Sequence, residues 1–389
     1  MKNLIFKTLI FSTLFVFNGV SQEIELPITA RVDTSKVAIK KVYHLYKQYM
    51  NSTPDSLYLN PNWNAAENEY FVKKYKVNAD RSVFQLYNFQ KAKDILQYHQ
   101  PKVIQIDSVA TNRYQIMTKF EAPNPPEGYE QHSFHSIVKL YAVRDSKGVF
   151  KLENSRNYDI RNWKKYQHQF IKYIVHPDCK FDKKEADKAV LFCEQLCKRF
   201  NLKVKPFTYY VLPNPDALGK LSNFEFWTYA LGGYTDTIMD EIYTSFGNLN
   251  FPHEFVHLLF PMKETRPTIV NEGLASWLAG PGYLETFDSS LILVSKAFQK
   301  REKVSLEDIM NYNFRFEFDN NILYVTGGVL CKMVYDKCGE KGIWQLLNTD
   351  KDTFKPVLEQ LFEMPYDQVE QKVITYILNY APEKETPKH

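Results

Sequence analysis

Several features are scarce or absent in this sequence of 389 residues. Glycine occurs only 14 times, and no internal repeat or low-complexity run is present, which excludes collagen-like and repeat architectures. The net charge is only +4, and no block of lysine and arginine is dense enough to indicate nucleic-acid binding. Beyond the first residues, no apolar run is long enough for a transmembrane helix. With 44% apolar and 15% aromatic residues, we expect a globular protein with an ample core.

The first 21 residues have the pattern of an export signal. Lys2 and Lys7 supply positive charge, an apolar run follows over 9–17, and Gly19 to Ser21 offers the small residues that a signal peptidase requires. This pattern predicts cleavage after Ser21. No cysteine lies near that point, which argues against a lipid anchor. We therefore expect an exported protein, periplasmic or secreted.

Cysteine is also rare. The five residues, Cys179, Cys193, Cys197, Cys331 and Cys338, cannot all pair within one chain. Cys193 and Cys197 lie one helical turn apart, and we interpret them as small buried apolar residues, with a second metal site as the alternative. A disulfide between Cys179 and either of them remains open at this stage.

The region from 22 to 163 has the pattern of a small α+β module. Val37, Val42 and Tyr46 recur at helical spacing and predict an amphipathic helix over 35–49. Alternating apolar residues predict strands at 103–109, 114–120, 136–143 and, after a turn at 145–148, at 149–152. A helix followed by antiparallel strands is typical of an α+β fold. This order of elements resembles the cone-shaped fold of the nuclear-transport-factor-like superfamily.

The region from 164 to 381 reads as a second domain. We expect a helix at 182–200, a strand at 207–212, an extended segment from 232 to 246, and short helices at 250–260 and 268–279. The rest, to about residue 378, has mostly helical periodicity, and residues 382–389 form a polar tail. Overall, the sequence predicts an α+β protein with a short sheet and a mostly helical C-terminal half in its second domain.

A metal-binding pattern lies in the first of these short helices. His253 and His257 flank Glu254 in an HExxH motif. Residues four apart on a helix share a face, with Cβ atoms about 5–6 Å apart, so both imidazoles can reach one ion. Zinc favours such nitrogen ligands, and Glu254 can hold and deprotonate a water molecule at its open position. The apolar residues around the motif predict a core helix, which favours a built site over an incidental pair of histidines.

The third ligand is indicated by a resemblance. The metzincin pattern is excluded, because positions 260 and 263 hold phenylalanine and lysine. Asn271, Glu272 and Gly273 begin the next helix, and this segment resembles the Asn-Glu-Gly-x-Ala segment of gluzincin zinc peptidases, especially their aminopeptidase-like members. The resemblance implies that Glu272 is the third zinc ligand.

A second segment carries the same resemblance. Tyr324 to Gly327 is similar to the Tyr-x-x-Gly segment of that branch, which implies that the Tyr324 hydroxyl stabilises the oxyanion of the reaction. Gly232, Gly233 and Tyr234 precede the zinc helix, where gluzincins have an edge strand that pairs with the substrate backbone. The Gly-Ala-Met-Glu-Asn segment of true aminopeptidases is absent; Asp236, Asp240 and Glu241 are the nearby acids that can replace its glutamate. The choice between endopeptidase and aminopeptidase therefore stays open.

The function expected from the sequence is zinc-dependent hydrolysis of peptide bonds. The ligands are His253, His257 and Glu272, the general base is Glu254, and the substrate is a peptide or protein. The alternative is a zinc-stabilised binding or scaffolding protein of the cell envelope that does not hydrolyse. The oligomeric state is not indicated by any pattern.

Overall fold

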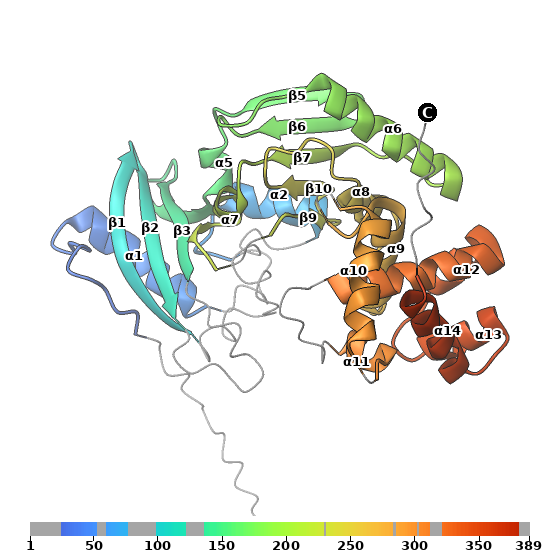
Figure 1. Cartoon of the computed structure of the whole chain (residues 1–389). Helices are drawn as coiled ribbons and strands as arrows, with labels where there is room; N and C mark the ends of the chain where they lie inside the picture. The colour runs from blue at the N-terminus through green and yellow to red at the C-terminus, as the bar shows by residue number, and fades with distance from the viewer. Residues whose placement is uncertain are drawn as a thin grey trace, which may run out of the picture.

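The structure is a computed structural model that describes residues 25–52, 60–76, 99–121, 136–228, 231–282, 285–301, 303–311 and 321–380 (Figure 1). The expected export signal (1–21) and polar tail (382–389) lie outside the described residues. The described chain contains both helices and sheets, so the predicted α+β class is confirmed. No helix among these residues has the length and apolar character needed to cross a membrane.

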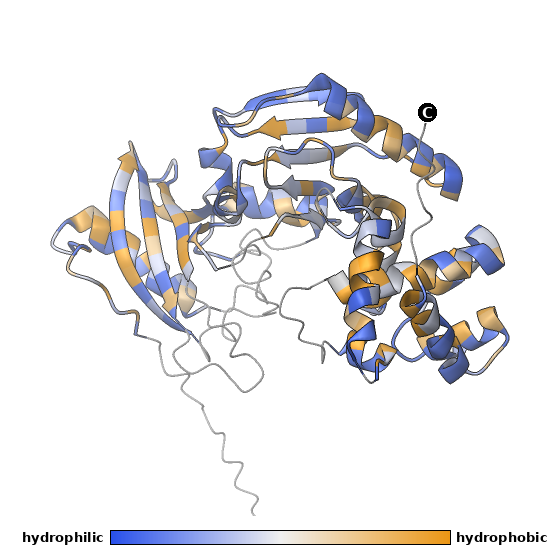
Figure 2. Ribbon diagram, viewed as in Figure 1, coloured by the Kyte–Doolittle hydropathy of each residue, from blue (hydrophilic) through white to orange (hydrophobic). Residues whose placement is uncertain are grey.

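The N-terminal sheet is antiparallel, with strand order β1 (Gln100–Ala110), β2 (Arg113–Glu121), β3 (Ser136–Arg144) and β4 (Phe150–Asn154). These strands and helix α1 (Val37–Met50) confirm the predicted elements. Figure 2 shows hydrophobic and hydrophilic residues alternating along β1 and β2, as expected for a sheet with one buried face. The core beneath includes Val42, Tyr46, Trp63, Val103, Ile116 and Leu152.

Helix α2 (Ala65–Tyr75) was not expected from the periodicity. Asn64 caps it by accepting bonds from Ala66 N and Glu67 N. Glu67 accepts hydrogen bonds from Trp63 Nε1 at 2.6 Å and from the Asn154 backbone at 3.2 Å. Burial raises the pKa of Glu67 to about 7 despite these donors.

The second sheet has the order β5 (Lys164–His168), β6 (Ile171–Val175), β7 (Phe207–Val211), β10 (Glu241–Thr244) and β9 (Gly233–Asp236). Strands β6, β7 and β10 are parallel, and β9 lies antiparallel to β10 at the end of the sheet. The expected single extended segment over 232–246 is therefore a hairpin. Asp236 stabilises its turn by accepting bonds from Ile238 N and Met239 N.

The three parallel strands of this second sheet are mostly buried on both faces, as is usual for parallel strands. Tyr173 and Tyr209 face a core shared with the helices, whereas Tyr210 and Tyr243 face the core of the N-terminal module. The short strand β8 (Phe224–Phe226), which follows α7 (Pro215–Leu221), pairs with β3. The second half of the sequence therefore contributes one strand to the N-terminal sheet.

A buried ion pair joins the N-terminal module to the second sheet. Arg156, on the short helix α5 (Arg156–Asp159), donates to Glu241 Oε2 at 2.8 Å, and the Tyr210 hydroxyl donates to Glu241 Oε1 at 3.4 Å. The pairing satisfies a carboxylate that is only 5% exposed.

The remaining described elements are helical, as the periodicity predicts. Helix α6 (Lys183–Phe200) covers one face of the second sheet, followed in sequence by α8 (Pro252–Leu259) and α9 (Thr268–Ala279) (Figure 1). The helices α10 (Phe287–Gln299), α11 (Leu306–Met310), α12 (Asn321–Leu347), α13 (Phe354–Phe362) and α14 (Tyr366–Leu378) complete the C-terminal half.

Candidate metal centre

Helix α8 presents its two histidines on one face. Pro252 occupies the first turn, where its missing N–H is not needed, and the helix ends at Leu259. Phe255 and Val256 point into the core and fix the rotation of the helix. His253 and His257 consequently lie with their Nε2 atoms 3.1 Å apart.

Helix α9 adds a carboxylate to this pair. Glu272 Oε2 lies 3.3 Å from the Nε2 atom of His253 and 3.3 Å from that of His257. Zinc bonds of about 2.0–2.1 Å at the tetrahedral angle place neighbouring ligand atoms about 3.3 Å apart. The three donors therefore fit a tetrahedral zinc ion, with the fourth position left for chemistry. Within the described chain, this is the one group of three such side chains close enough to share an ion.

The orientation of the His253 ring is fixed by a hydrogen bond at Nδ1, the ring nitrogen that is not directed at the metal position. Its Nδ1 atom lies 2.8 Å from the carbonyl oxygen of Gly280, so Nδ1–H donates and Nε2 keeps a lone pair for a metal. Gly280 ends α9 with a φ of +91°, and a β-carbon there would lie 2.1 Å from the Glu285 oxygen. Only glycine can place its carbonyl at this point, which the sequence motifs did not indicate.

Electrostatics within the cluster favour an ionised carboxylate. Burial alone opposes ionisation of Glu272, but hydrogen bonds and charge from His253 and His257 outweigh it and hold its pKa well below the usual range. Burial lowers the pKa of His257, yet its hydrogen bond to Glu272 and the negative charges of Glu272 and Glu254 raise it overall.

A buried arginine fixes the loop between the two ligand-bearing helices. Arg266 is 7% exposed and donates to the carbonyl oxygens of Leu347 and Pro261 and, at 2.7 Å, to Asn271 Oδ1. Since Asn271 immediately precedes Glu272, this arginine anchors the first turns of α9 next to the ligand carboxylate. Its role was not expected from the sequence.

Glu254 is hydrogen-bonded to the second sheet and does not join the ligand triangle. Its carboxylate is buried, with the residue 6% exposed, and accepts a hydrogen bond from Thr235 Oγ1 at 2.8 Å. It forms no described bond to His253, His257 or Glu272, so it is left available as a base beside the cluster. Thr235 is a site residue that the sequence motifs did not reveal.

Tyr324 reaches the same cluster from helix α12. Its ring stacks on the His253 imidazole with centroids 5.8 Å apart and an interplanar angle of 19°. The residue is half-buried, so its ring closes one side of the candidate site. The structure thus brings together all five residues expected to bind metal or carry out catalysis.

The expected substrate-binding residues lie on β9 or just before it. The Tyr234 side chain points away from the metal cluster and stacks on Tyr243 with centroids 4.6 Å apart. A β-carbon at Gly233 would lie 2.7 Å from the backbone carbonyl oxygen of Tyr243, so glycine is needed here for β9 to pack closely against β10. For Gly232, Gly233 and Tyr234, only the backbone is placed to meet a peptide.

The acids weighed as partners for a substrate amine already have partners. Asp236 stabilises the β9–β10 turn, Asp240 pairs with Lys205 at 2.5 Å, and Glu241 pairs with Arg156. None of the three points to the ligand triangle in the described contacts.

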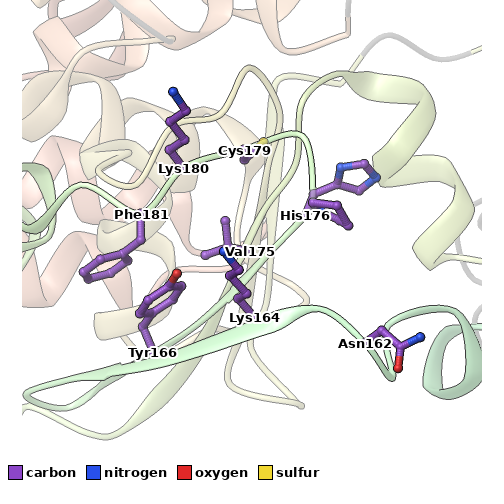
Figure 3. Close-up of a pocket in the computed structure, with 9 residues that line it drawn as sticks. Asn162, Lys164, Tyr166, Val175, His176, Cys179, Lys180 and Phe181 are labelled. Carbon is purple, nitrogen blue, oxygen red and sulfur yellow. The ribbon is translucent and has the colours of Figure 1, made fainter.

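A separate pocket of about 390 Å³ lies beside β5 and the loop that follows β6. Figure 3 shows the side-chain sticks that line it, with Tyr166 and Phe181 side by side at 4.4 Å between centroids. The full lining is Asn162, Lys164, Tyr166, Val175, His176, Pro177, Cys179, Lys180 and Phe181. It includes no residue of the metal cluster, so the candidate chemistry is not located there.

All five cysteines are free thiols. Neither of the disulfides considered for Cys179 is present. Cys193 and Cys197 lie in the helical core, 0% and 4% exposed, which confirms the interpretation as small buried residues.

No known protein family and no curated protein matches this chain.

Proposed function

We propose that this protein is a zinc-dependent peptidase of the gluzincin type. The observation that carries the proposal is the convergence of His253 Nε2, His257 Nε2 and Glu272 Oε2 within 3.1–3.3 Å, with the buried carboxylate of Glu254 on the same helix as the histidines and outside this group of three. When bound, zinc supplies a Lewis acid that polarises a carbonyl group and lowers the pKa of water to about 7.

Two residues of the protein carry out the remaining steps, which are proton transfer and stabilisation of the oxyanion. Glu254 accepts the proton of the attacking water and passes it to the leaving amine. The Tyr324 hydroxyl donates to the oxyanion that forms as the water adds to the peptide carbonyl. Burial of Glu254 keeps bulk water away from the proton being transferred. A purely structural zinc site needs neither a base nor an open position.

The backbone of β9 is the proposed binding strip for the substrate. It is the last strand of its sheet, and its outer edge has no described partner strand. A peptide can add to such an edge through main-chain hydrogen bonds. The expected substrate is therefore an extended peptide or an extended segment of a protein.

The deciding experiment compares wild type with Glu254→Gln on a peptide library. Glu254→Gln keeps the side-chain shape but removes the proton acceptor, so cleavage should fall by about 10²–10⁴-fold while zinc remains bound. Glu264→Gln, in the exposed loop after α8, is the matched control and should be fully active. If wild type cuts no peptide, or Glu254→Gln cuts as fast as wild type, the peptidase proposal is wrong and the zinc-stabilised binding protein is favoured.

A further inference from the structure

Strand β9 brings a threonine against the helix that carries the base. Successive side chains of a strand point to opposite faces. Because Tyr234 stacks on Tyr243 on the face toward the N-terminal module, Thr235 must point to the other face, where α8 lies (Figure 1). Gly233, on that same face, lets the strand approach: a β-carbon there would lie 3.1 Å from the Phe251 ring.

The Thr235 hydroxyl meets Glu254 twice. Its Oγ1 lies 2.8 Å from the carboxylate oxygen Oε2 and 2.9 Å from the backbone carbonyl oxygen of the same residue. A hydroxyl has a single proton, and its bond to an ionised carboxylate is the stronger of the two. Thr235 is the only residue with a described hydrogen bond to this carboxylate. The hydroxyl therefore donates to one carboxylate oxygen, Oε2, and holds that oxygen beside the main chain of the same residue.

We propose that Thr235 is a positioning residue for Glu254. The inference rests on the proposed peptidase function and adds a residue to it. By occupying Oε2, the hydroxyl directs the second carboxylate oxygen to the water that is to be deprotonated. Without it, a glutamate side chain with several rotatable bonds spends less time in the productive orientation.

The position of Thr235 also links the base to the substrate-binding strand. Thr235 pairs through its backbone with Ile242 of β10, and the opposite edge of β9 is where a peptide would add. Its side chain does not line that edge. Loss of the hydroxyl should therefore lower kcat and leave KM nearly unchanged.

Three substitutions at this position test the inference. Thr235→Val removes the hydroxyl and keeps the shape, and it should lower kcat about 10- to 100-fold, the usual cost of losing a hydrogen bond to a charged group. Thr235→Ser should recover most of that loss. Thr235→Ala and Thr235→Ser both lack the methyl group and differ only in the hydroxyl, so this pair isolates its effect if the valine variant folds poorly. Thr237→Val, in the adjoining turn, is the control and should match wild type.

Zinc content and thermal midpoint are measured for every variant and kcat is expressed per bound zinc. A valine variant as active as wild type, or a serine variant as inactive as alanine, overturns the role of Thr235. Glu254→Gln is assayed in parallel. If Glu254→Gln is inactive while Thr235→Val is fully active, only the positioning role fails. If Glu254→Gln itself is fully active, the peptidase proposal fails and the positioning role fails with it.

Discussion

Gly273 and Gly327 meet backbone to backbone where α9 crosses α12. A β-carbon at Gly273 would lie 2.3 Å from the carbonyl carbon of Gly327, and one at Gly327 would lie 2.1 Å from the Ile269 oxygen. Glu272 precedes one glycine directly, and Tyr324 precedes the other by one turn. The crossing therefore places a metal ligand and a candidate oxyanion donor around the same site.

The crossing makes alanine costly where it is normally favourable. In an exposed helix, Gly→Ala stabilises by about 1 kcal/mol. At position 327 the added carbon meets backbone, which cannot move aside as a side chain can, and overpacking costs about 1–3 kcal/mol or more. We expect Gly327→Ala to lower both the thermal midpoint and the zinc content. Gly282→Ala, whose nearest neighbour would be the Glu285 side chain at 3.6 Å, is the control and should change neither.

Removal of the metal should destabilise the folded protein. A ligand present at 100 times its Kd stabilises by about 2.7 kcal/mol, so a chelator should lower the thermal midpoint and added zinc should restore it. His253→Ala and Glu272→Ala should lose most bound zinc and become insensitive to the chelator. His168→Ala, which breaks a pair with Asp187 on the surface, should retain zinc. Equal zinc content in all of these variants, measured by elemental analysis, would refute the ligand assignment.

Tyr324→Phe separates turnover from metal binding. The substitution keeps the ring that stacks on His253 and removes only the hydroxyl. Loss of one oxyanion donor costs about 10²–10³-fold in turnover, and the loss should appear in kcat because the charge is absent in the ground state. Tyr335→Phe, on the same helix, should be unaffected. Full activity of Tyr324→Phe would require another donor; Tyr283, the next candidate by position, lies outside the described residues.

Glu67 gives the protein a pH-dependent stability that is unrelated to the metal. Its pKa is about 7 in the folded state, above the value of about 4.3 for an unfolded chain, so the folded state binds more protons between these values. The free energy of unfolding should therefore fall as the pH rises from about 4.5 through 7, by up to about 3 kcal/mol. Glu67→Gln resembles the protonated form and should flatten this part of the profile. Denaturant titrations that give the same free energy of unfolding at pH 5 and pH 8 would contradict the prediction.

The first residue of the mature protein tests the predicted export signal. The mature protein should begin at or near Gln22, because the sequence predicts signal cleavage after Ser21. N-terminal sequencing of material from the periplasm or medium checks this. An intact Met1 on a protein recovered from the cytoplasm would show that the signal assignment is wrong.

Local geometry explains what was predictable from the sequence. The spacing of His253 and His257 places both on one face of any α-helix, and the apolar residues between them bury that helix, so their proximity required no knowledge of the fold. Helical periodicity over 182–200 and alternation over 103–109 predicted α6 and β1 for the same reason. The assignment of Glu272 and Tyr324 came from short segments that resemble gluzincins, since spacing along the chain does not specify their distance from the histidines.

The tertiary structure decided everything that depends on contacts between distant segments. The bond from Thr235 to Glu254 spans 19 residues and that from His253 to Gly280 spans 27, and both require that separate elements pack in one arrangement. The sequence predicts one extended segment where the structure has the hairpin of β9 and β10, because the turn depends on Asp236 and on Asp240 at a φ of +52°. Helix periodicity and strand alternation are set by the backbone within a few residues. The crossing at Gly273 and Gly327 is set by how two surfaces fit, which only the folded chain reveals.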